Sequence, residues 1–236
     1  MKLFRGHAAN ESSQDEPSAD EFALHRAEMI ENQLRRRGVS DSRVLSAMAA
    51  VRREEFVPNE FRRRAYEDAP LPIGEGQTIS QPYIVAAMTA ALNLAGHERV
   101  LEIGTGCGYQ AAILSHLSKI VFSIESHSEL AATAAARLER LGYANVHVHC
   151  GDGTLGLHEL APFDAILVAA AAPAVPEPLR TQLSEGGRLI LPVGDAENQE
   201  LLYIERHGNS FQTQTLEACR FVPLIGYYGW KEPPAR

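Results

Sequence analysis

Cysteine is scarce in this chain of 236 residues, which has only Cys107, Cys150 and Cys219. So small and odd a number argues against a fold held by disulfides and suits a reducing compartment. No early apolar run resembles the core of a signal peptide. No uncharged apolar stretch is long enough to span a bilayer. We therefore expect a cytoplasmic protein without a membrane partner.

Positive charge is also in deficit, with 22 Lys and Arg against 30 Asp and Glu and a formal net charge of -8. Nucleic-acid binders usually carry a basic footprint, so we expect no nucleic-acid partner. Arginines nevertheless cluster at Arg35–Arg37, Arg52–Arg53 and Arg62–Arg64. We interpret these clusters as solvated helix faces, with a docking surface for an acidic partner as the alternative.

The start of the chain has few apolar residues, and we expect residues 1–21 to form a disordered tail. From Phe22 onward apolar residues recur at helical spacing until Gly38, and a second helix is predicted near Ser40 and Asp41. One domain is expected over residues 22–236, a length that suits a single full core.

The rest of the domain alternates between strand and helix patterns. We predict strands at Val100–Ile103, Ile120–Glu125, Val146–Cys150, Ala165–Ala170, Arg188–Pro192, Glu200–Arg206 and Cys219–Leu224, with helices from Pro82 to Leu94 and from near Tyr109, Ser128 and Pro176. Such alternation predicts an α/β fold, a doubly wound and mostly parallel seven-stranded sheet preceded by N-terminal helices. The last two strands are expected to form a hairpin.

A glycine-rich turn follows the first strand of this alternation, between it and the helix at Tyr109. Backbone N–H groups and the positive end of a helix would face a ligand there. A dinucleotide fingerprint needs Gly-x-Gly-x-x-Gly, but Tyr109 stands where its third glycine belongs. The pattern Glu-x-Gly-x-Gly-x-Gly instead resembles sites for S-adenosylmethionine. We expect this stretch to contribute Glu102, Gly104, Thr105, Gly106 and Gly108 to a cofactor site.

Acidic residues stand at the ends of three predicted strands, namely Glu102, Glu125 and Asp152. In a doubly wound sheet these ends meet where ligands bind. Glu125 is expected to accept hydrogen bonds from ribose hydroxyls, and Asp152, followed by Gly153, one from an adenine amino group. A cationic sulfonium tolerates acidic surroundings better than a pyrophosphate does. The three positions together favour a cofactor site, although each alone suits a cap or turn residue equally well. A dinucleotide dehydrogenase would also use Glu125, so Glu102 and the alternate glycines are what favour S-adenosylmethionine.

A metal site is the competing interpretation of His147, His149, Cys150 and Asp152, which lie within six residues. Neither a Cys-x-x-Cys nor a His-x-x-x-His pair stands nearby to complete a tetrahedral shell. We expect no metal. Cys107 is interpreted as a small filler beside the cofactor, because no base is placed next to it by the sequence.

Several segments together resemble the protein-L-isoaspartate O-methyltransferase family over about residues 28 to 230. They are Leu71–Gly74, Gln77–Pro82, Leu101–Gln110, Gly151–Gly153, Ala161–Ile166, Gly186–Leu189, Pro192–Gly194 and Phe221–Leu224. The glycine motif alone indicates a methyltransferase. The segment Thr78-Ile79-Ser80-Gln81-Pro82 narrows the resemblance to this family.

The resemblance implies a Rossmann-like class I fold that uses S-adenosylmethionine to methylate the free α-carboxylate of L-isoaspartyl residues in damaged proteins and peptides. The methyl ester leads through a succinimide back towards normal aspartate, which is a protein repair. Ser80 is then the catalytic residue, and Thr78 is the neighbouring hydroxyl that helps. The alternative role of Ser80 is a helix N-cap. If Pro82 opens the helix, however, Gln81 occupies that position.

The chain departs from the family pattern at a few positions. The family usually reads Val-Pro-Arg-Glu where this chain has Val51–Glu54, so Arg52 replaces a proline. We expect this change to affect a helix end. Cys107 replaces a common serine and Ala169 a common threonine, which puts polar contacts there in doubt. Other activities stay open: methylation of a small metabolite or another protein carboxyl, or cofactor binding without catalysis. A nicotinamide dehydrogenase is disfavoured by Tyr109.

Overall fold

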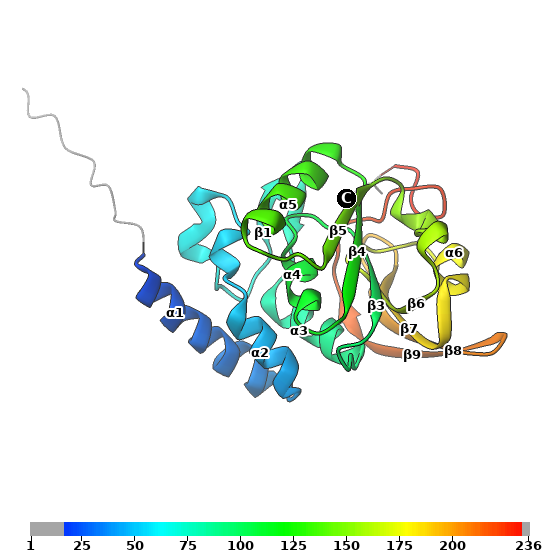
Figure 1. The fold of residues 1–236 in the computed structure, drawn as a ribbon, viewed down its shortest axis with the longest axis horizontal. Coiled ribbons are helices and arrows are strands. Elements are labelled where there is room, and N and C mark those ends of the chain that lie inside the picture. Colours follow the sequence, from blue (N-terminus) through cyan, green and yellow to red (C-terminus); the bar gives the residue numbers. More distant parts are fainter. Residues whose placement is uncertain (1–16, 233–236) are drawn as a thin grey trace, which may run out of the picture.

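The computed structural model describes residues 17–232 and contains a seven-stranded sheet in the order β5-β4-β3-β6-β7-β8-β9 (Figure 1). The strands are β3 (Arg99–Ile103), β4 (Ile120–Glu125), β5 (Val146–Cys150), β6 (Phe163–Val168), β7 (Leu183–Gly194), β8 (Gln199–His207) and β9 (Ser210–Cys219). Strands β3 to β7 run parallel, whereas β8 and β9 are antiparallel. The predicted doubly wound, mostly parallel sheet is confirmed.

Helices cover the two faces of the sheet unequally. Side chains alternate between the faces of each strand. Thus Val100 and Val121 pack towards α3 (Pro82–Ala91), α4 (Tyr109–Ser115) and α5 (Ser128–Arg140). Leu101, Ile103 and Phe122 pack on the opposite face, with α6 (Glu177–Thr181) and the short 3₁₀ turns η5 (Gly153–Leu155) and η6 (His158–Leu160) nearby. In Figure 1 the larger helical layer lies to the left of the sheet.

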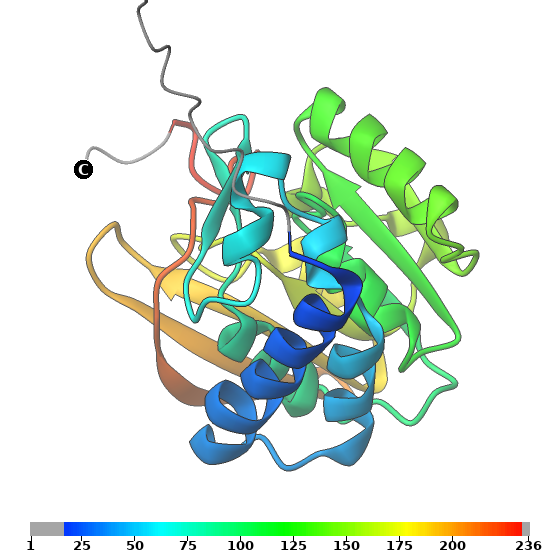
Figure 2. The same ribbon diagram turned by 90° about the vertical axis from the view of Figure 1, so that its left-hand side faces the viewer.

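The N-terminal part is helical from Ala19 to Arg37. Helix α1 (Ala19–Glu28) continues as the π-helical η1 (Met29–Leu34) and the 3₁₀ turn η2 (Arg35–Arg37). The chain then leaves the helix at Gly38, whose φ is +96°, as the sequence predicts. Helix α2 (Ser42–Ala50) follows, capped by Asp41. Figure 2 shows these helical segments side by side across the near side of the molecule.

The predicted tail boundary is too late. Residues 1–16 lie outside the described part of the chain. Ser18 is the N-cap of α1 and forms a capping box with Glu21, so residues 19–21 are helical. The reciprocal hydrogen bonds of Ser18 and Glu21 satisfy donors that the first helical turn leaves free.

Two 3₁₀ segments and a small hairpin link α2 to α3. The segments are η3 (Arg53–Glu55) and η4 (Asn59–Arg64), and the hairpin pairs β1 (Leu71–Gly74) with β2 (Gln77–Ile79). Helix α3 begins at Pro82 with Gln81 as its N-cap, as expected from the sequence. It ends at Ala91, so the predicted helix is three residues too long.

The last predicted strand, Cys219–Leu224, is wrong. Strand β9 covers Ser210–Cys219 and pairs with β8 through a tight turn at Gly208, whose φ is +60°. This edge strand is polar and mostly exposed, so it lacks the alternating apolar pattern that marks a half-buried strand. Pro223 cannot donate to a ladder. Beyond Cys219 the segment forms no strand; it is held by a bridge between Pro223 and Ala171 and by hydrogen bonds between Phe221 and the side chain of Gln199.

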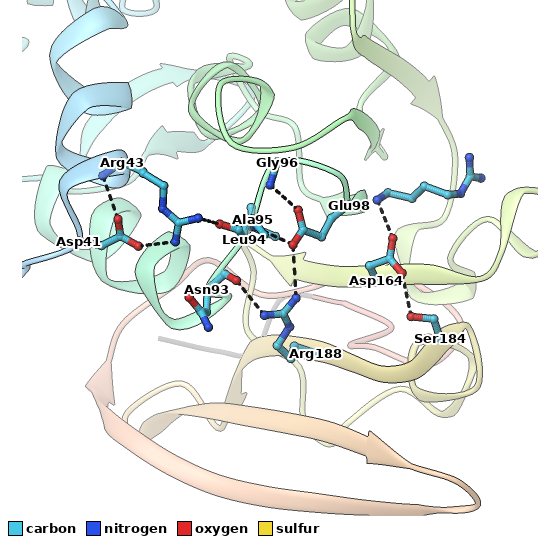
Figure 3. A network of polar contacts seen from close by, with 11 residues as sticks. Asp41, Arg43, Asn93, Leu94, Ala95, Gly96, Glu98, Asp164, Ser184 and Arg188 are labelled. Carbon is cyan, nitrogen blue, oxygen red and sulfur yellow. Dashed lines mark hydrogen bonds and ion pairs between the residues drawn. The ribbon is translucent and has the colours of Figure 1, made fainter.

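A polar network secures the amino end of β3, away from the carboxyl ends of the strands (Figure 3). The buried Glu98 carboxylate accepts hydrogen bonds from the backbone N–H groups of Ala95 (2.7 Å) and Gly96 (2.8 Å). Arg188 of β7 lies 3.7 Å from Glu98, and Arg43 of α2 donates to the Leu94 carbonyl. The network therefore ties the N-terminal layer to the centre of the sheet.

The arginine clusters differ from one another in the structure. Arg35–Arg37 are exposed, as the solvated-face interpretation requires. Arg53 contradicts it, because its side chain is completely buried. The extended backbone of Arg52, with φ at −79°, is also one that proline could adopt. No helix among residues 17–232 has the length and apolar character needed to cross a membrane.

Candidate functional site

A pocket opens at the carboxyl ends of the central strands, between the glycine turn, hairpin β1–β2 and the segment after β9. Of the residues predicted from sequence, it is lined by Thr78, Ser80, Gly104, Thr105, Gly106, Glu125 and Gly153. Glu102, Gly108 and Asp152 do not line it. This is the position at which doubly wound sheets bind ligands.

The glycine turn keeps backbone atoms at the pocket surface. Gly104 has a φ of +90° and donates its N–H to the Ile124 carbonyl at 2.8 Å. Gly106 has a φ of +53°, and a Cβ built there would stand 3.2 Å from Cδ1 of Ile73 in the hairpin. Only a residue without a side chain adopts this turn freely while the hairpin lies so close.

Glu125 presents a fixed carboxylate to the pocket. Its Oε2 accepts the Gly106 N–H at 2.8 Å, and its Oε1 accepts the His127 N–H at 3.0 Å. Glu125 as a whole is only 5% exposed. Each carboxylate oxygen can accept more than one hydrogen bond. Free acceptor capacity therefore remains for the hydroxyls of a ribose.

Glu102 has a different role, because it lies entirely inside the sheet. It accepts a short hydrogen bond from the Ser123 hydroxyl, which lies 2.5 Å from the hydroxyl of Thr105. Burial raises its pKa to about 8; Ser123 opposes this shift and the nearby Glu125 adds to it. Glu102 is therefore mainly a neutral acid at pH 7. It supports the glycine turn through Ser123 and Thr105 without facing a ligand.

Gly108 also acts behind the pocket. It is the N-cap of α4 with a φ of +90°, and a Cβ there would stand 3.1 Å from Cδ1 of Leu138 in α5. The close contact brings α5 against the start of α4. Gly108 thus allows the close packing of α5 against the turn, and it does not line the pocket.

Asp152 is directed to the C-terminal segment. Its Oδ1 accepts from the Thr154 N–H (2.9 Å) and hydroxyl (2.6 Å), and its Oδ2 accepts the Tyr227 N–H at 2.7 Å. The next residue, Gly153, does line the pocket, and a Cβ there would stand 2.4 Å from Cγ2 of Ile103. Asp152 and Gly153 therefore join the loop after β5 to both the pocket floor and the C-terminal segment at Tyr227.

Ser80 and Thr78 stand at the exit of the hairpin. Since Gln81 caps α3, the Ser80 hydroxyl is not used as a helix cap. Within residues 17–232 neither hydroxyl has a hydrogen-bond partner, whereas the Ser80 carbonyl accepts from Nη2 of Arg53 at 2.8 Å. Both hydroxyls are therefore available to a ligand, and the backbone of Ser80 is held in place.

Several pocket residues were missed by sequence reasoning. Gln77 and His127 both line it, with 3.5 Å between their Nε2 atoms. Val222–Ile225 form another wall, held by hydrogen bonds between Ala171 and both Val222 and Leu224 (2.8 Å each). Gln77 belongs to the segment that carries the family resemblance, which is a usable signal. Val222–Leu224 likewise belong to a segment that carries the family resemblance, although no local pattern indicates that they pair with Ala171, just after β6.

Two of the three departures from the family pattern, Cys107 and Ala169, also lie at the pocket. Cys107 is buried, and burial raises the pKa of its thiol, which suits a filler and disfavours a nucleophile. Ala169 approaches the glycine turn, where a Cβ on Gly104 would stand 3.6 Å from its own Cβ. In the described part of the chain no group of three His, Cys, Asp or Glu could hold a metal ion. His147 and His149 instead pack against the ring of Phe122.

The family model described as protein-L-isoaspartate(D-aspartate) O-methyltransferase matches residues 24–228. The chain is 54% identical over 220 residues to the protein-L-isoaspartate O-methyltransferase of Koribacter versatilis (strain Ellin345), covering 93% of this chain and 98% of that one. It is 57% identical over 210 residues to the enzyme of the same name from Roseiflexus castenholzii (strain DSM 13941 / HLO8), covering 89% and 96%.

Solved structures agree with these relatives. A protein-L-isoaspartate O-methyltransferase superimposes with a TM-score of 0.79 at 33% identity, over 86% of this chain and 67% of the other. A putative protein-L-isoaspartate O-methyltransferase from Plasmodium falciparum, in complex with S-adenosyl-L-homocysteine, gives a TM-score of 0.74 at 28% identity, over 85% and 98%.

Proposed function

Because this chain belongs to the protein-L-isoaspartate(D-aspartate) O-methyltransferase family, we propose that it methylates the α-carboxylate of L-isoaspartyl residues in damaged proteins and peptides. The observation that carries the proposal is the junction of two elements in one pocket. The glycine turn with Glu125 meets the hairpin end with Ser80 there. The first suits a nucleoside and the second a carboxylate.

The donor set fits S-adenosylmethionine. The Glu125 carboxylate would hold the ribose hydroxyls, and Gly104, Gly106 and Gly153 leave space for close approach of the ligand to the backbone. When bound, S-adenosylmethionine supplies a methyl group on a positively charged sulfur, which leaves with the electron pair of the broken C–S bond. Asp152 would contribute indirectly, by holding the loop that carries Gly153.

The acceptor needs no general base. A peptide α-carboxyl has an ordinary pKa of about 3.3 to 3.7, so at neutral pH it is already an ionised nucleophile. The chain must remove water from this carboxylate and aim one oxygen at the methyl group. Correct alignment is worth up to about 7 to 11 kcal/mol of barrier in ideal cases.

The hydroxyls of Ser80 and Thr78 suit this task. Both lie at the pocket, and neither forms a hydrogen bond to another described residue. A hydroxyl donor orients a carboxylate oxygen without the full charge of a lysine, which would damp its nucleophilicity. The amino end of α3, beginning at Pro82, adds a positive dipole beside them.

The product is a neutral methyl ester, which leads through a succinimide back towards aspartate. The proposed reaction is therefore the first step of a protein repair. We further propose a cytoplasmic location, one catalytic domain that includes α1 from Ala19, and a role without nucleic acid. A net charge of -8 supports the last of these.

Two peptides that differ only in Asp versus isoAsp test the proposal. The chain is incubated with each peptide and S-adenosylmethionine labelled in its methyl group. Label transfer to the isoaspartyl peptide alone is expected. Equal labelling of both peptides would contradict repair and favour a broader carboxyl methyltransferase, and tight cofactor binding without transfer would indicate a binding module.

A further inference from the structure

Arg53 is a completely buried cation directly behind the pocket wall. Its Nε donates to the Ala65 carbonyl at 2.7 Å and its Nη2 to the Ser80 carbonyl at 2.8 Å. Its guanidinium carbon lies 4.8 Å from the ring centre of Tyr109. Ser80 and Tyr109 both line the pocket. One buried side chain therefore touches two of its walls.

No carboxylate among residues 17–232 forms an ion pair with Arg53, and its Nη1 has no hydrogen-bond partner there. The adjacent Glu54 accepts from the Tyr66 hydroxyl and lies 3.9 Å from Arg26. Burial lowers the pKa of Arg53, but a guanidinium is effectively always protonated in proteins. A buried, unpaired charge is unfavourable for folding, so its retention calls for an explanation.

We propose that Arg53 is a positioning residue that supplies positive potential to the site of the isoaspartyl carboxylate. It acts through the Ser80 peptide, whose carbonyl it holds, and it does not touch the substrate. The inference rests on the proposed function. In this arrangement the substrate carboxylate is the missing counter-charge of the buried guanidinium.

The proposal predicts an effect on binding more than on chemistry. The carboxylate carries a full negative charge when it binds and loses it as the ester forms. A positive potential therefore favours the bound substrate over the transition state. We expect Arg53→Met to raise KM for an isoaspartyl peptide about tenfold, as one partly screened charge interaction would. The expected change in kcat is less than about threefold.

The discriminating measurement uses two competing peptides. One has the isoaspartyl α-carboxylate, and the other has an uncharged α-carboxamide at the same position. The wild type should bind the carboxylate at least about tenfold more tightly, and Arg53→Met should lose most of this ratio. A purely structural role would weaken both peptides equally and keep the ratio, which would overturn the proposal. A wild-type ratio below about threefold would overturn it as well.

Matched variants separate charge from packing. Arg53→Lys keeps the charge, so the carboxylate ratio should persist even if overall affinity falls. If Arg53→Met does not fold, Arg53→Gln replaces it, because its amide can still donate to a carbonyl. The exposed neighbour Arg52, changed to Met, should leave the ratio unaltered.

The wild-type enzyme also separates the two possible failures. If it does not methylate the isoaspartyl peptide at all, the proposed function is wrong. If it methylates that peptide and Arg53→Met leaves the binding ratio of carboxylate to carboxamide peptide unchanged, only the proposed role of Arg53 is wrong.

Discussion

Two glutamates one strand apart show how burial assigns different roles to the same side chain. Glu125 ends β4 and its carboxylate is held by the backbone N–H groups of Gly106 and His127 at the pocket. Glu102 lies in β3, fully buried, with Ser123 as its partner. Complete burial favours the neutral form of Glu102. Only Glu125 is placed to bind a ligand.

Replacing Glu102 with Gln should remove a pH dependence from the stability of the fold. The folded pKa of Glu102 is raised to about 8 from an ordinary 4.5, so the folded chain keeps a proton that the unfolded chain loses. Its contribution to the free energy of unfolding is thus greatest at low pH. It falls by up to about 1.4 kcal/mol per pH unit as the pH rises between these values. Urea unfolding at pH 5.5, 6.5 and 7.5 measures this slope.

The comparison of Glu102→Gln with the wild type cancels the contributions of other titrating groups. The wild type should lose stability relative to the variant as the pH rises. Parallel stability curves for the two proteins would show that Glu102 is ionised in the fold.

The Ser80 hydroxyl should matter for methyl transfer and little for cofactor binding. Ser80→Ala removes a donor to the carboxylate but leaves the backbone contact with Arg53 and the start of α3. We expect kcat/KM to fall by about 10-fold or more, the size of one hydrogen bond to a charged group. The Kd for S-adenosylhomocysteine, measured by calorimetry, should change less than about twofold. A large loss of cofactor affinity would instead place Ser80 in the cofactor site.

At the scale of elements, the loop after β5 connects the pocket floor to the C-terminal segment at Tyr227 and Tyr228. Gly153 packs against Ile103 of β3, while Asp152 and Thr154 accept hydrogen bonds from the backbone of Tyr227 and Tyr228. A shift of this loop therefore moves both the cofactor surface and the segment Val222–Ile225.

Gly153→Ala tests this coupling. Its Cβ would stand 2.4 Å from the branched Ile103 side chain, so the loop must shift. We expect the Kd for S-adenosylhomocysteine to rise about tenfold and the fold to lose about 1–3 kcal/mol. Gly151→Ala is the matched control, because nothing lies within 4 Å of its built Cβ. Equal effects of the two substitutions, by calorimetry and thermal unfolding, would contradict the role of the contact.

Asp152→Ala should loosen the C-terminal segment. The carboxylate is the acceptor for the Tyr227 N–H at 2.7 Å, and the substitution leaves that donor without its partner. Hydrogen exchange around residues 225–230 should accelerate by about fivefold or more, the effect of losing about 1 kcal/mol of local protection. Exchange in the strands should stay unchanged. Unaltered exchange at 225–230 would show that the segment is held by other contacts.

At the scale of the whole molecule, the pocket draws on segments far apart in the chain. The hairpin, the ends of β3, β4 and β6, the loop after β5 and Val222–Ile225 all contribute. Since the site forms only when these segments fold together, a ligand that binds it stabilises the entire domain.

S-adenosylhomocysteine at a hundred times its Kd should therefore stabilise the fold by about 2.7 kcal/mol. For a domain of this size the midpoint of thermal unfolding should rise by roughly 5–10 °C. Differential scanning fluorimetry measures the shift, and Ser80→Ala should show the same shift as the wild type. Adenosine at the same concentration is the control and, as the weaker ligand, should give a smaller shift. If neither ligand shifts the midpoint of unfolding, the result would argue against a cofactor site.

Local patterns predicted most of the fold. Alternating strand and helix patterns sufficed for the parallel strands, Gly38 for the end of the first helical segment, and Pro82 for the start of α3. Strand β9 escaped prediction because an exposed edge strand carries no alternating apolar pattern. The burial of Arg53 escaped it because a pair of arginines usually lies at the surface.

The sequence by itself determined the family, the type of sheet and the segments that meet at the site, because these depend on residue type and spacing along the chain. Only the tertiary structure decided which side chains face the pocket. Glu102 lies inside the sheet and Asp152 holds the C-terminal segment, although both stand in the same kind of motif as Glu125. The direction and burial of a side chain depend on the neighbouring helices and strands, and these cannot be read from the spacing of residues along the chain.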